Sequence, residues 1–392
     1  MPTPIKKRED FTAAFPRIDT ANVHDYNKTN QIEDDIPARG ETLIAGGRKM
    51  KKMMKRLTCA LLALVMVLGL TACGDSDSKV KVPKEYEGYV SPWEMNVVEA
   101  AKADGKMHYY FMSAEGYMVN PTGSSKTKWG DSCLIVFPDG TTMLIDAGLA
   151  GHAPILTLNL QRMGIEKLDY FVLSHPHDDH GYGAVKEGGI LYNFPVGQVY
   201  YNGAYNGDWG NPQVLVDLCQ QKGYPCDVLQ RGDKLTIGGV SIEILGPNPE
   251  VIGTTIVDNV TAVNNSSIVM RFDYGEHSSL FCGDVYKTAE RELANYDRAK
   301  LDVDLLKMPH HGGDTSSDST FIYAVTAELG VATGWDPVDV AVFGRYKGTK
   351  TTILMDTEDG YIHVSSGKDG VMSYETSRER SEKSTFGQLN KG

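Results

Sequence analysis

Residues 170–180 read YFVLSHPHDDH, so an apolar run is followed at once by three histidines and two aspartates within six positions. Imidazole and carboxylate groups at this density are typical of a binding site for Zn²⁺ or a neighbouring first-row metal. Alternate residues of an extended loop point the same way, so we expect His175 and His177 to bind one ion. Asp179 and His180 are then expected to face a second ion. A solvated turn is the alternative interpretation, and the apolar strand directly before the motif argues against it.

Residues 50–72 have the features of a lipoprotein signal peptide. A basic start is followed by an apolar run from Leu57 to Leu70 and by the sequence Leu-Thr-Ala-Cys that ends at Cys73. This pattern predicts export, with Cys73 as the lipid anchor on the outer face of a bacterial cytoplasmic membrane. A transmembrane helix is the alternative, but the apolar run is shorter than the roughly 20 residues that such a helix needs.

The other parts of the chain are assigned by composition. Residues 1–49 are polar, mixed in charge and aperiodic, and we interpret them as a non-native or disordered extension. If translation starts at Met50, N-terminal sequencing of the unprocessed protein will find that residue first. Residues 73–106 are expected to form a tether and lead-in, residues 107–374 one globular domain, and residues 375–392 a polar tail.

The charge balance of the exported chain is acidic. The whole sequence has 39 basic and 51 acidic residues, and its first 72 residues hold 12 and 8 of them. The exported part therefore keeps 27 basic and 43 acidic residues, a net charge of −16. A protein that binds polyanions normally carries a basic stripe, and none is visible here. This balance argues against tight nonspecific binding to nucleic acid.

The cysteines of the exported part allow two interpretations. Cys133 and Cys282 lie inside apolar, strand-like runs, where a buried free thiol is expected. Cys219 and Cys226 flank a short segment and could form a disulfide in an exported protein, with two free thiols as the alternative.

Apolar periodicity predicts strands that alternate with helices, as in a layered α/β sandwich. Strands are expected at residues 107–112, 133–137, 142–145, 170–173, 198–201, 234–245 as a hairpin, 267–272, 279–282 and 303–308. Helices are expected at residues 153–163, 213–221, 287–298 and 320–329.

Four further polar motifs lie at the ends of these expected strands. Asp146 follows the strand 142–145, and Asp284 follows the strand 279–282. The pair His310-His311 ends the strand 303–308, and Asn264-Asn265 opens the strand 267–272.

With these motifs the chain resembles the metallo-β-lactamase superfamily, over about residues 107–374. The resemblance implies a four-layer αββα sandwich with metal ligands on loops at one edge of the sheets. It implies that Asp146 steadies the histidine loop and that Asp284 bridges two metal ions. One residue of the pair His310-His311 would complete the second site, and His311 is preferred. The implied metal ligands are His175, His177, Asp179, His180, Asp284 and His311.

One branch of the superfamily matches best: the extracellular domain of DNA-uptake competence channels, with phosphorylcholine esterase similar at the same places. The chain departs from the wider superfamily in one respect, because a third histidine usually completes the first metal site. The only histidine between the histidine loop and Asp284 is His277, which we expect at the far end of its strand. Asn264 or Asn265 stands where that ligand would be. The first site is therefore expected to be weaker or partly ligated by water.

Two adjacent divalent ions are the expected cofactors, with Zn²⁺ first and Mn²⁺ or Fe²⁺ as alternatives. Ions in such a pair lower the pKa of a shared water from about 15.7 toward 7 and so provide a hydroxide nucleophile. The candidate catalytic residues are Asp179, Asp284 and His310, of which His310 would donate a proton to the leaving group. We expect a hydrolase of a phosphate ester or phosphodiester, whether small molecule or polymer. The alternatives are an amide or β-lactam hydrolase and a non-catalytic binding lipoprotein.

Overall fold

The computed structural model describes residues 100, 102–112, 130–207, 211–334 and 338–380. The chain separates into two units, Met1–Asp77 and Ser78–Gly392, and all described residues belong to the second. The extension at 1–49, the signal peptide at 50–72 and the anchor Cys73 lie outside the described residues and stay predictions. Within the described ranges, no helix combines the length and apolarity that crossing a bilayer requires.

Two large sheets organise the domain. The eight-stranded sheet has the order β17-β16-β1-β2-β3-β4-β5-β7, and the seven-stranded sheet has the order β15-β14-β13-β12-β11-β9-β8. The first sheet consists of β1 (Met107–Phe111), β2 (Cys133–Val136), β3 (Thr142–Ile145), β4 (Leu168–Val172), β5 (Val196–Tyr201), β7 (Cys226–Val228), β16 (Ile362–Ser366) and β17 (Met372–Thr376). The second consists of β8 (Lys234–Ile237), β9 (Val240–Gly246), β11 (Val269–Tyr274), β12 (His277–Phe281), β13 (Leu305–Lys307), β14 (Leu329–Ala332) and β15 (Thr352–Met355). A small separate sheet pairs β6 (Tyr205–Asn206) with β10 (Thr255–Ile256).

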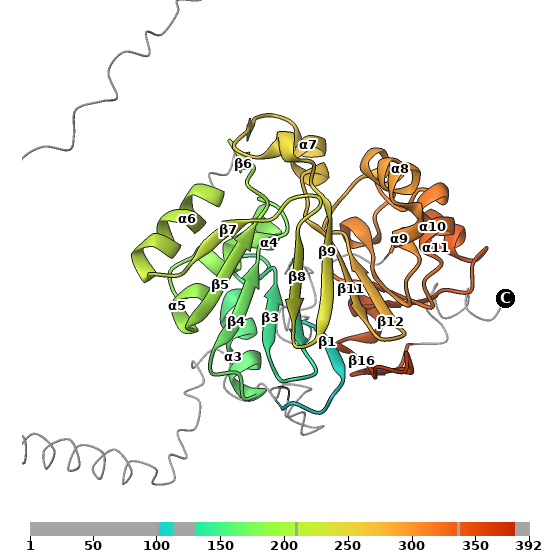
Figure 1. The fold of residues 1–392 in the computed structure, drawn as a ribbon, viewed down its shortest axis with the longest axis horizontal. Helices are drawn as coiled ribbons and strands as arrows, with labels where there is room; N and C mark the ends of the chain where they lie inside the picture. The colour runs from blue at the N-terminus through green and yellow to red at the C-terminus, as the bar shows by residue number, and fades with distance from the viewer. Residues whose placement is uncertain (1–99, 101, 113–129, 208–210, 335–337, 381–392) are drawn as a thin grey trace, which may run out of the picture. The chain divides into compact units, whose positions relative to one another are not determined.

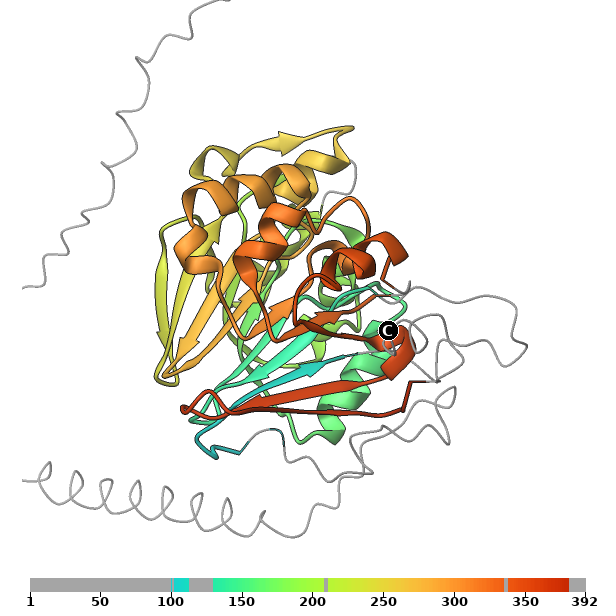
Figure 2. The ribbon, with the colours of Figure 1, turned by 90° about the vertical axis from the view of Figure 1, so that its right-hand side faces the viewer.

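Helices cover the outer faces of both sheets (Figures 1 and 2). Those beside the first sheet are α3 (Ala153–Arg162), α4 (Asp178–Val185), α5 (Ile190–Asn193) and α6 (Asn211–Lys222). Those beside the second are α8 (Lys287–Tyr296), α9 (Arg298–Leu301), α10 (Ser319–Val325) and α11 (Val340–Tyr346). The remaining helical segments are α7 (Val260–Asn265), α12 (Asp356–Asp359) and two 3₁₀ turns, Pro249–Val251 and Pro309–Gly312.

Three buried apolar cores separate these four layers. Strand β2 shows how the sequence builds them, because successive side chains of a strand point to opposite faces. Leu134 and Val136 belong to the core beneath the helices of the first sheet, whereas Cys133 and Ile135 belong to the core between the two sheets. A strand buried on both faces is continuously apolar, as β2 is. The four-layer αββα sandwich expected from the sequence is confirmed.

Parallel pairing decides where the polar motifs meet. Strands β3, β4, β5 and β7 run parallel to one another, as do β12 to β15 in the second sheet. The carboxyl ends of parallel neighbours lie at the same edge of a sheet. The segments that follow β3, β4, β12 and β13 therefore emerge beside one another.

Three of the expected boundaries are wrong. Asn264 and Asn265 end the helix α7 instead of opening a strand, because the backbone first turns through Ser266 and Ser267. The helix expected at 320–329 ends at Val325, and Leu329 begins β14. The pairing of β14 with β13 and β15, in a strand that is buried at all four positions, overrides the local helical spacing.

The polar tail expected from Glu375 begins later than predicted. Strand β17 includes that residue, and Arg380 forms an ion pair with the buried Asp359 at 2.5 Å. An edge strand is held by backbone hydrogen bonds, so its side chains can be polar and exposed.

The alternative interpretation of Cys219 and Cys226 applies, because both thiols are free in the structure.

The core between the sheets can be tested at Phe272, which is 1% exposed and packs against Phe137 and Phe281. Substitution Phe272→Ala is expected to lower the free energy of unfolding by about 3–5 kcal/mol, since it leaves a cavity that the two sheets cannot close. Urea unfolding measures the change. Tyr296→Ala, at a side chain that is 77% exposed, is the control and should change stability by less than about 0.5 kcal/mol. Equal effects of both substitutions would contradict the packing.

Candidate metal centre

The histidine loop joins the end of β4 to the start of α4. His175 is completely buried, and His177 keeps an extended backbone before α4 begins at Asp178. The two side chains meet, with His175 Nε2 2.9 Å from His177 Nδ1. Asp179 and His180 reach the site from the first turn of a helix, not from the extended loop that the sequence suggested. The ring of His180 lies next to that of His175, with centroids 4.2 Å apart.

Asp146 fixes the position of this loop. Its backbone is left-handed, with φ 59°, directly after β3. Its carboxylate accepts hydrogen bonds from the backbone N–H and the hydroxyl of Ser174, each at 2.7 Å, and from His180 Nδ1 at 2.8 Å. Because Nδ1 of His180 is held by Asp146, Nε2 is the nitrogen directed at the centre of the site.

Close backbone packing brings α4 to this position. A Cβ atom on Gly183 would lie 1.9 Å from the carbonyl oxygen of Ala147, so only glycine allows the contact. The Gly183 N–H donates to the Gly148 carbonyl at 2.8 Å. The helix and the Asp146 loop are thereby joined along their backbones.

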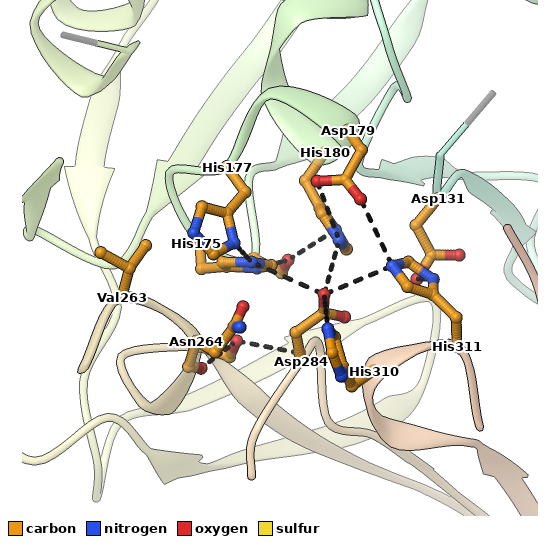
Figure 3. A network of polar contacts seen from close by, with 12 residues as sticks. Asp131, His175, His177, Asp179, His180, Val263, Asn264, Asp284, His310 and His311 are labelled. Atoms are coloured by element: carbon orange, nitrogen blue, oxygen red, sulfur yellow. Dashed lines mark hydrogen bonds and ion pairs between the residues drawn. The ribbon is translucent and has the colours of Figure 1, made fainter. Parts of the chain in front are cut away.

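Four histidines surround the carboxylate of Asp284, which follows β12 (Figure 3). The imidazole nitrogens that lie 3.1–4.0 Å from Asp284 Oδ2 belong to His175, His180, His310 and His311. Asp284 is 1% exposed, and its other oxygen, Oδ1, is buried without a hydrogen-bond partner. A buried carboxylate with a free oxygen beside several imidazoles is suited to bind a cation.

Two sets of candidate metal ligands share this carboxylate. The first set is His175, His177 and Asp284, and the second is Asp131, His180, Asp284 and His311. Within each set the ligand atoms all lie within 4.8 Å of one another. Asp179 adjoins the second set, with Oδ2 3.4 Å from His311 Nε2. The residues present thus fit two ions that share one bridging carboxylate.

The two adjacent histidines after β13 play different parts. His311 Nδ1 donates to the Thr333 carbonyl at 2.9 Å, which leaves Nε2 facing Asp284 at 3.3 Å. His310 Nε2 lies farther from Asp284, at 4.0 Å, and its Nδ1 hydrogen-bonds the hydroxyl of Thr315. The His310 side chain is 27% exposed and that of His311 is 10% exposed. This geometry favours His311 as the ligand and leaves His310 at the open rim of the site.

The charges of the site depend on one another. Burial raises the pKa of Asp284, but the nearby positive charges of His180 and His311 outweigh it and hold that pKa well below its usual range. Burial by itself would lower the pKa of His311, but the nearby carboxylates, chiefly Asp284, together have the larger effect and raise this pKa to about 10. Burial, together with the charge of His180, lowers the pKa of His175 well below its usual range. A divalent ion can replace the protons that these carboxylates attract onto His180 and His311.

Asp131 and Lys307 belong to the site although the sequence motifs did not reveal them. Both are buried, and Lys307 Nζ lies 2.6 Å from Asp131 Oδ2. Burial by itself would lower the pKa of Lys307. The nearby carboxylates, chiefly Asp131 and Asp284, together have the larger effect and raise this pKa above its usual value, so Lys307 and Asp131 form an ion pair. Asp131 also accepts from the hydroxyl of Thr333, whose carbonyl holds His311. The sequence signal that could have revealed this ion pair is the lysine in the otherwise apolar strand β13.

Of three other residues considered for the first metal site, one points into the site and two do not. Asn264 is 1% exposed and its side chain points into the site, as Figure 3 shows. Asn265 points elsewhere, because its amide donates to Thr288 at 3.1 Å and accepts from the Tyr286 N–H at 2.8 Å. His277 begins β12, at the far end of that strand from Asp284, and lies 3.0 Å from the Tyr109 hydroxyl.

Comparison with known proteins agrees with this arrangement. Residues 128–332 match the family described as the Metallo-beta-lactamase superfamily. The chain belongs to this superfamily. The resemblance inferred from the motifs is therefore confirmed, and proteins of this superfamily are hydrolase-like and bind a dinuclear metal centre.

Relatives in the superfamily include two competence proteins. ComE operon protein 3 of Bacillus subtilis is 28% identical over 165 residues, which are 42% of this chain and 19% of that protein. Competence protein ComA of Neisseria gonorrhoeae is 26% identical over 240 residues, 58% of this chain and 30% of that protein. The chain thus spans less than a third of either relative. Among solved structures, the metallo-β-lactamase fold protein YhfI of Bacillus subtilis aligns with a TM-score of 0.40 and 14% identity, over 69% of this chain and 100% of that one.

Removal of the shared carboxylate tests the metal centre. Wild-type protein is expected to bind close to two divalent ions per chain, and Asp284→Ala fewer than one, because both ligand sets lose the same group. Metal analysis by mass spectrometry after dialysis measures the stoichiometry. Asp217→Ala, at an exposed carboxylate of α6, is the control and should keep the wild-type metal content. Undiminished binding in Asp284→Ala would refute the bridging role.

Proposed function

We propose that this chain is a metal-dependent hydrolase of a phosphate ester or phosphodiester. The observation that supports the proposal most directly is the sharing of Asp284 between two sets of ligands, with His310 at the open rim beside them. When bound, two divalent ions would supply Lewis acidity and a water of lowered pKa. The residues of the chain hold the ions, orient the reacting groups and transfer the proton.

His310 is suited to act on the leaving group. Its ring packs against that of Tyr286, with centroids 4.9 Å apart, and Thr315 holds Nδ1. Its Nε2 faces Asp284 Oδ2 from the open rim, at 4.0 Å, where it could give a proton to a leaving oxygen. Asp179 lies in the first turn of α4, and its carboxylate interacts with His311 beside the second set of ligands.

The phosphoester substrate class rests on the branch to which the chain is related. The competence proteins are its relatives. The chain resembles that branch, and phosphorylcholine esterase, at Asn264-Asn265, at Asp284 and at the pair His310-His311. The absence of a third histidine ligand between the histidine loop and Asp284 argues against a β-lactam substrate. The net charge of −16 for residues 73–392 favours a small phosphodiester or a cell-wall ester over a long nucleic acid.

The proposed location is the outer surface of the cytoplasmic membrane, with Cys73 as the lipid anchor. The signal-like sequence at 50–72 supports export, and the two competence relatives are consistent with a membrane-associated or extracellular role. Both zinc and the harder ions manganese and iron remain compatible with the mixed imidazole and carboxylate ligands.

Turnover of model substrates tests the reaction class. The exported domain loaded with Zn²⁺ or Mn²⁺ is expected to hydrolyse bis(p-nitrophenyl) phosphate, and Asp179→Ala should lower kcat/KM by at least about 100-fold. A chromogenic cephalosporin should not be hydrolysed. Cephalosporin turnover without phosphodiester turnover would support the amide hydrolase instead. Metal-free, inactive protein would support a binding lipoprotein.

The role of His310 predicts a dependence on the leaving group. His310→Ala should lower kcat by about 10²–10⁴-fold for an alkyl phosphodiester, whose alkoxide must be protonated as it leaves. The same substitution should affect the p-nitrophenyl ester far less, because nitrophenolate leaves without a proton. Steady-state kinetics with both esters, at saturating metal, measures the difference. An equal loss for both would indicate that His310 acts in another way.

A further inference from the structure

We propose that the side-chain oxygen of Asn264 is a ligand of the first metal ion, beside His175, His177 and Asp284. This assignment rests on the proposed two-ion function and goes beyond it, because the first set has only three members among the histidines and carboxylates. Three protein ligands and a water make a four-coordinate catalytic site, and one further oxygen donor would make it five-coordinate. Asn264 is the uncharged oxygen donor that the fold brings to the open side of that set.

A single hydroxyl group links Asn264 to the bridging carboxylate. The Ser267 hydroxyl donates to the Asn264 backbone carbonyl at 2.7 Å and accepts from the Asp284 N–H at 3.0 Å. The Ser267 N–H donates to the same Asn264 carbonyl at 3.0 Å. The backbones of the two residues are thus held next to one another, independently of either side chain.

The helix that carries Asn264 is anchored at its end. Asn202, which is completely buried, donates to the Ser266 carbonyl at 2.8 Å and to the Ser266 hydroxyl at 2.9 Å. That hydroxyl donates in turn to the Val263 carbonyl at 2.6 Å. These contacts preorganise the last turn of α7, so the Asn264 side chain enters the site from a rigid element.

The surroundings of the Asn264 amide oxygen favour a cation. The amide oxygen, Oδ1, is buried and has no hydrogen-bond partner. In Figure 3 the side chain points toward the space between His175 and Asp284. A buried carbonyl oxygen without a partner is unfavourable, and a cation beside His175 would satisfy it.

Asn265 shows that this arrangement is specific to one of the two asparagines. Both of its amide atoms are already used, by Thr288 and by the Tyr286 N–H, and it is only partly buried. The neighbouring residue therefore serves as a matched control with the same side chain on the same helix.

The ligand set has a consequence for metal choice. An amide oxygen is a harder and weaker ligand than the third imidazole that usually completes this site. A set of two imidazoles, one carboxylate and one amide oxygen is therefore expected to bind Zn²⁺ less tightly and to tolerate Mn²⁺ better. The first site should load after the second, which has Asp131, His180, Asp284 and His311, with Asp179 beside them.

Calorimetric titration of the metal-free domain with ZnCl₂ and with MnCl₂ tests the assignment. Asn264→Ala should weaken one of the two binding events by about 10–100-fold and leave the other unchanged. Asn264→Asp keeps an oxygen in place but loses the amide N–H groups. If Asn264 is a ligand, the aspartate variant should bind at least as tightly as wild type. If Asn264 acts only as a hydrogen-bond donor, the aspartate variant should be as weak as the alanine variant, and the proposal is wrong.

Cobalt substitution gives a second readout that does not depend on activity. The visible absorption of bound Co²⁺ reports the ligands, and it should change in Asn264→Ala but not in Asn265→Ala. Thermal unfolding of the metal-free variants confirms that each is folded. Unchanged titrations and spectra in Asn264→Ala would overturn the assignment while leaving the two-ion hydrolase intact. Wild-type protein that binds no metal would instead refute the proposed function itself.

Discussion

A carboxylate that is 1% exposed is stable in its charged form only when positive charge lies close to it. Asp284 meets this requirement through imidazoles that come from two separate segments of the chain, one after β4 and one after β13. The charged carboxylate at the end of β12 therefore depends on both segments being packed against it. The shared carboxylate couples the two sheets at their common edge, and the ligands of both expected ions are placed relative to it.

Backbone strain is concentrated at the same edge. Asp146, His310 and His311 all have positive φ values, 59°, 47° and 56°, which non-glycine residues seldom adopt. Each costs about 1–3 kcal/mol and persists only when the surroundings enforce it. Hydrogen bonds from Ser174 to Asp146 and from His311 to the Thr333 carbonyl provide that enforcement. Outliers of this kind are common where a site must hold side chains in one fixed arrangement.

Much of the centre could be predicted because its ligands are close in sequence and chemically distinctive. The histidine loop, Asp284 and the pair His310-His311 each follow an apolar strand, and parallel strands deliver such residues to one edge. Asp131 and Lys307 were missed, since an isolated aspartate and an isolated lysine carry no spacing pattern. Their pairing at 2.6 Å exists only because β2 begins beside the end of β13, a strand of the other sheet.

The sequence by itself determined the order of strands and helices, the layered class and the residue types of the centre, since these follow from periodicity and from local motifs. Only the tertiary structure decided which of two neighbouring residues does what. His311 lies closer to Asp284, at 3.3 Å, and is held by the Thr333 carbonyl, whereas His310 lies 4.0 Å away and is more exposed. Asn264 enters the site and Asn265 leaves it because they occupy adjacent positions on a helix, about 100° apart. A local pattern cannot resolve such pairs, since their roles depend on which distant strand or loop lies on each side.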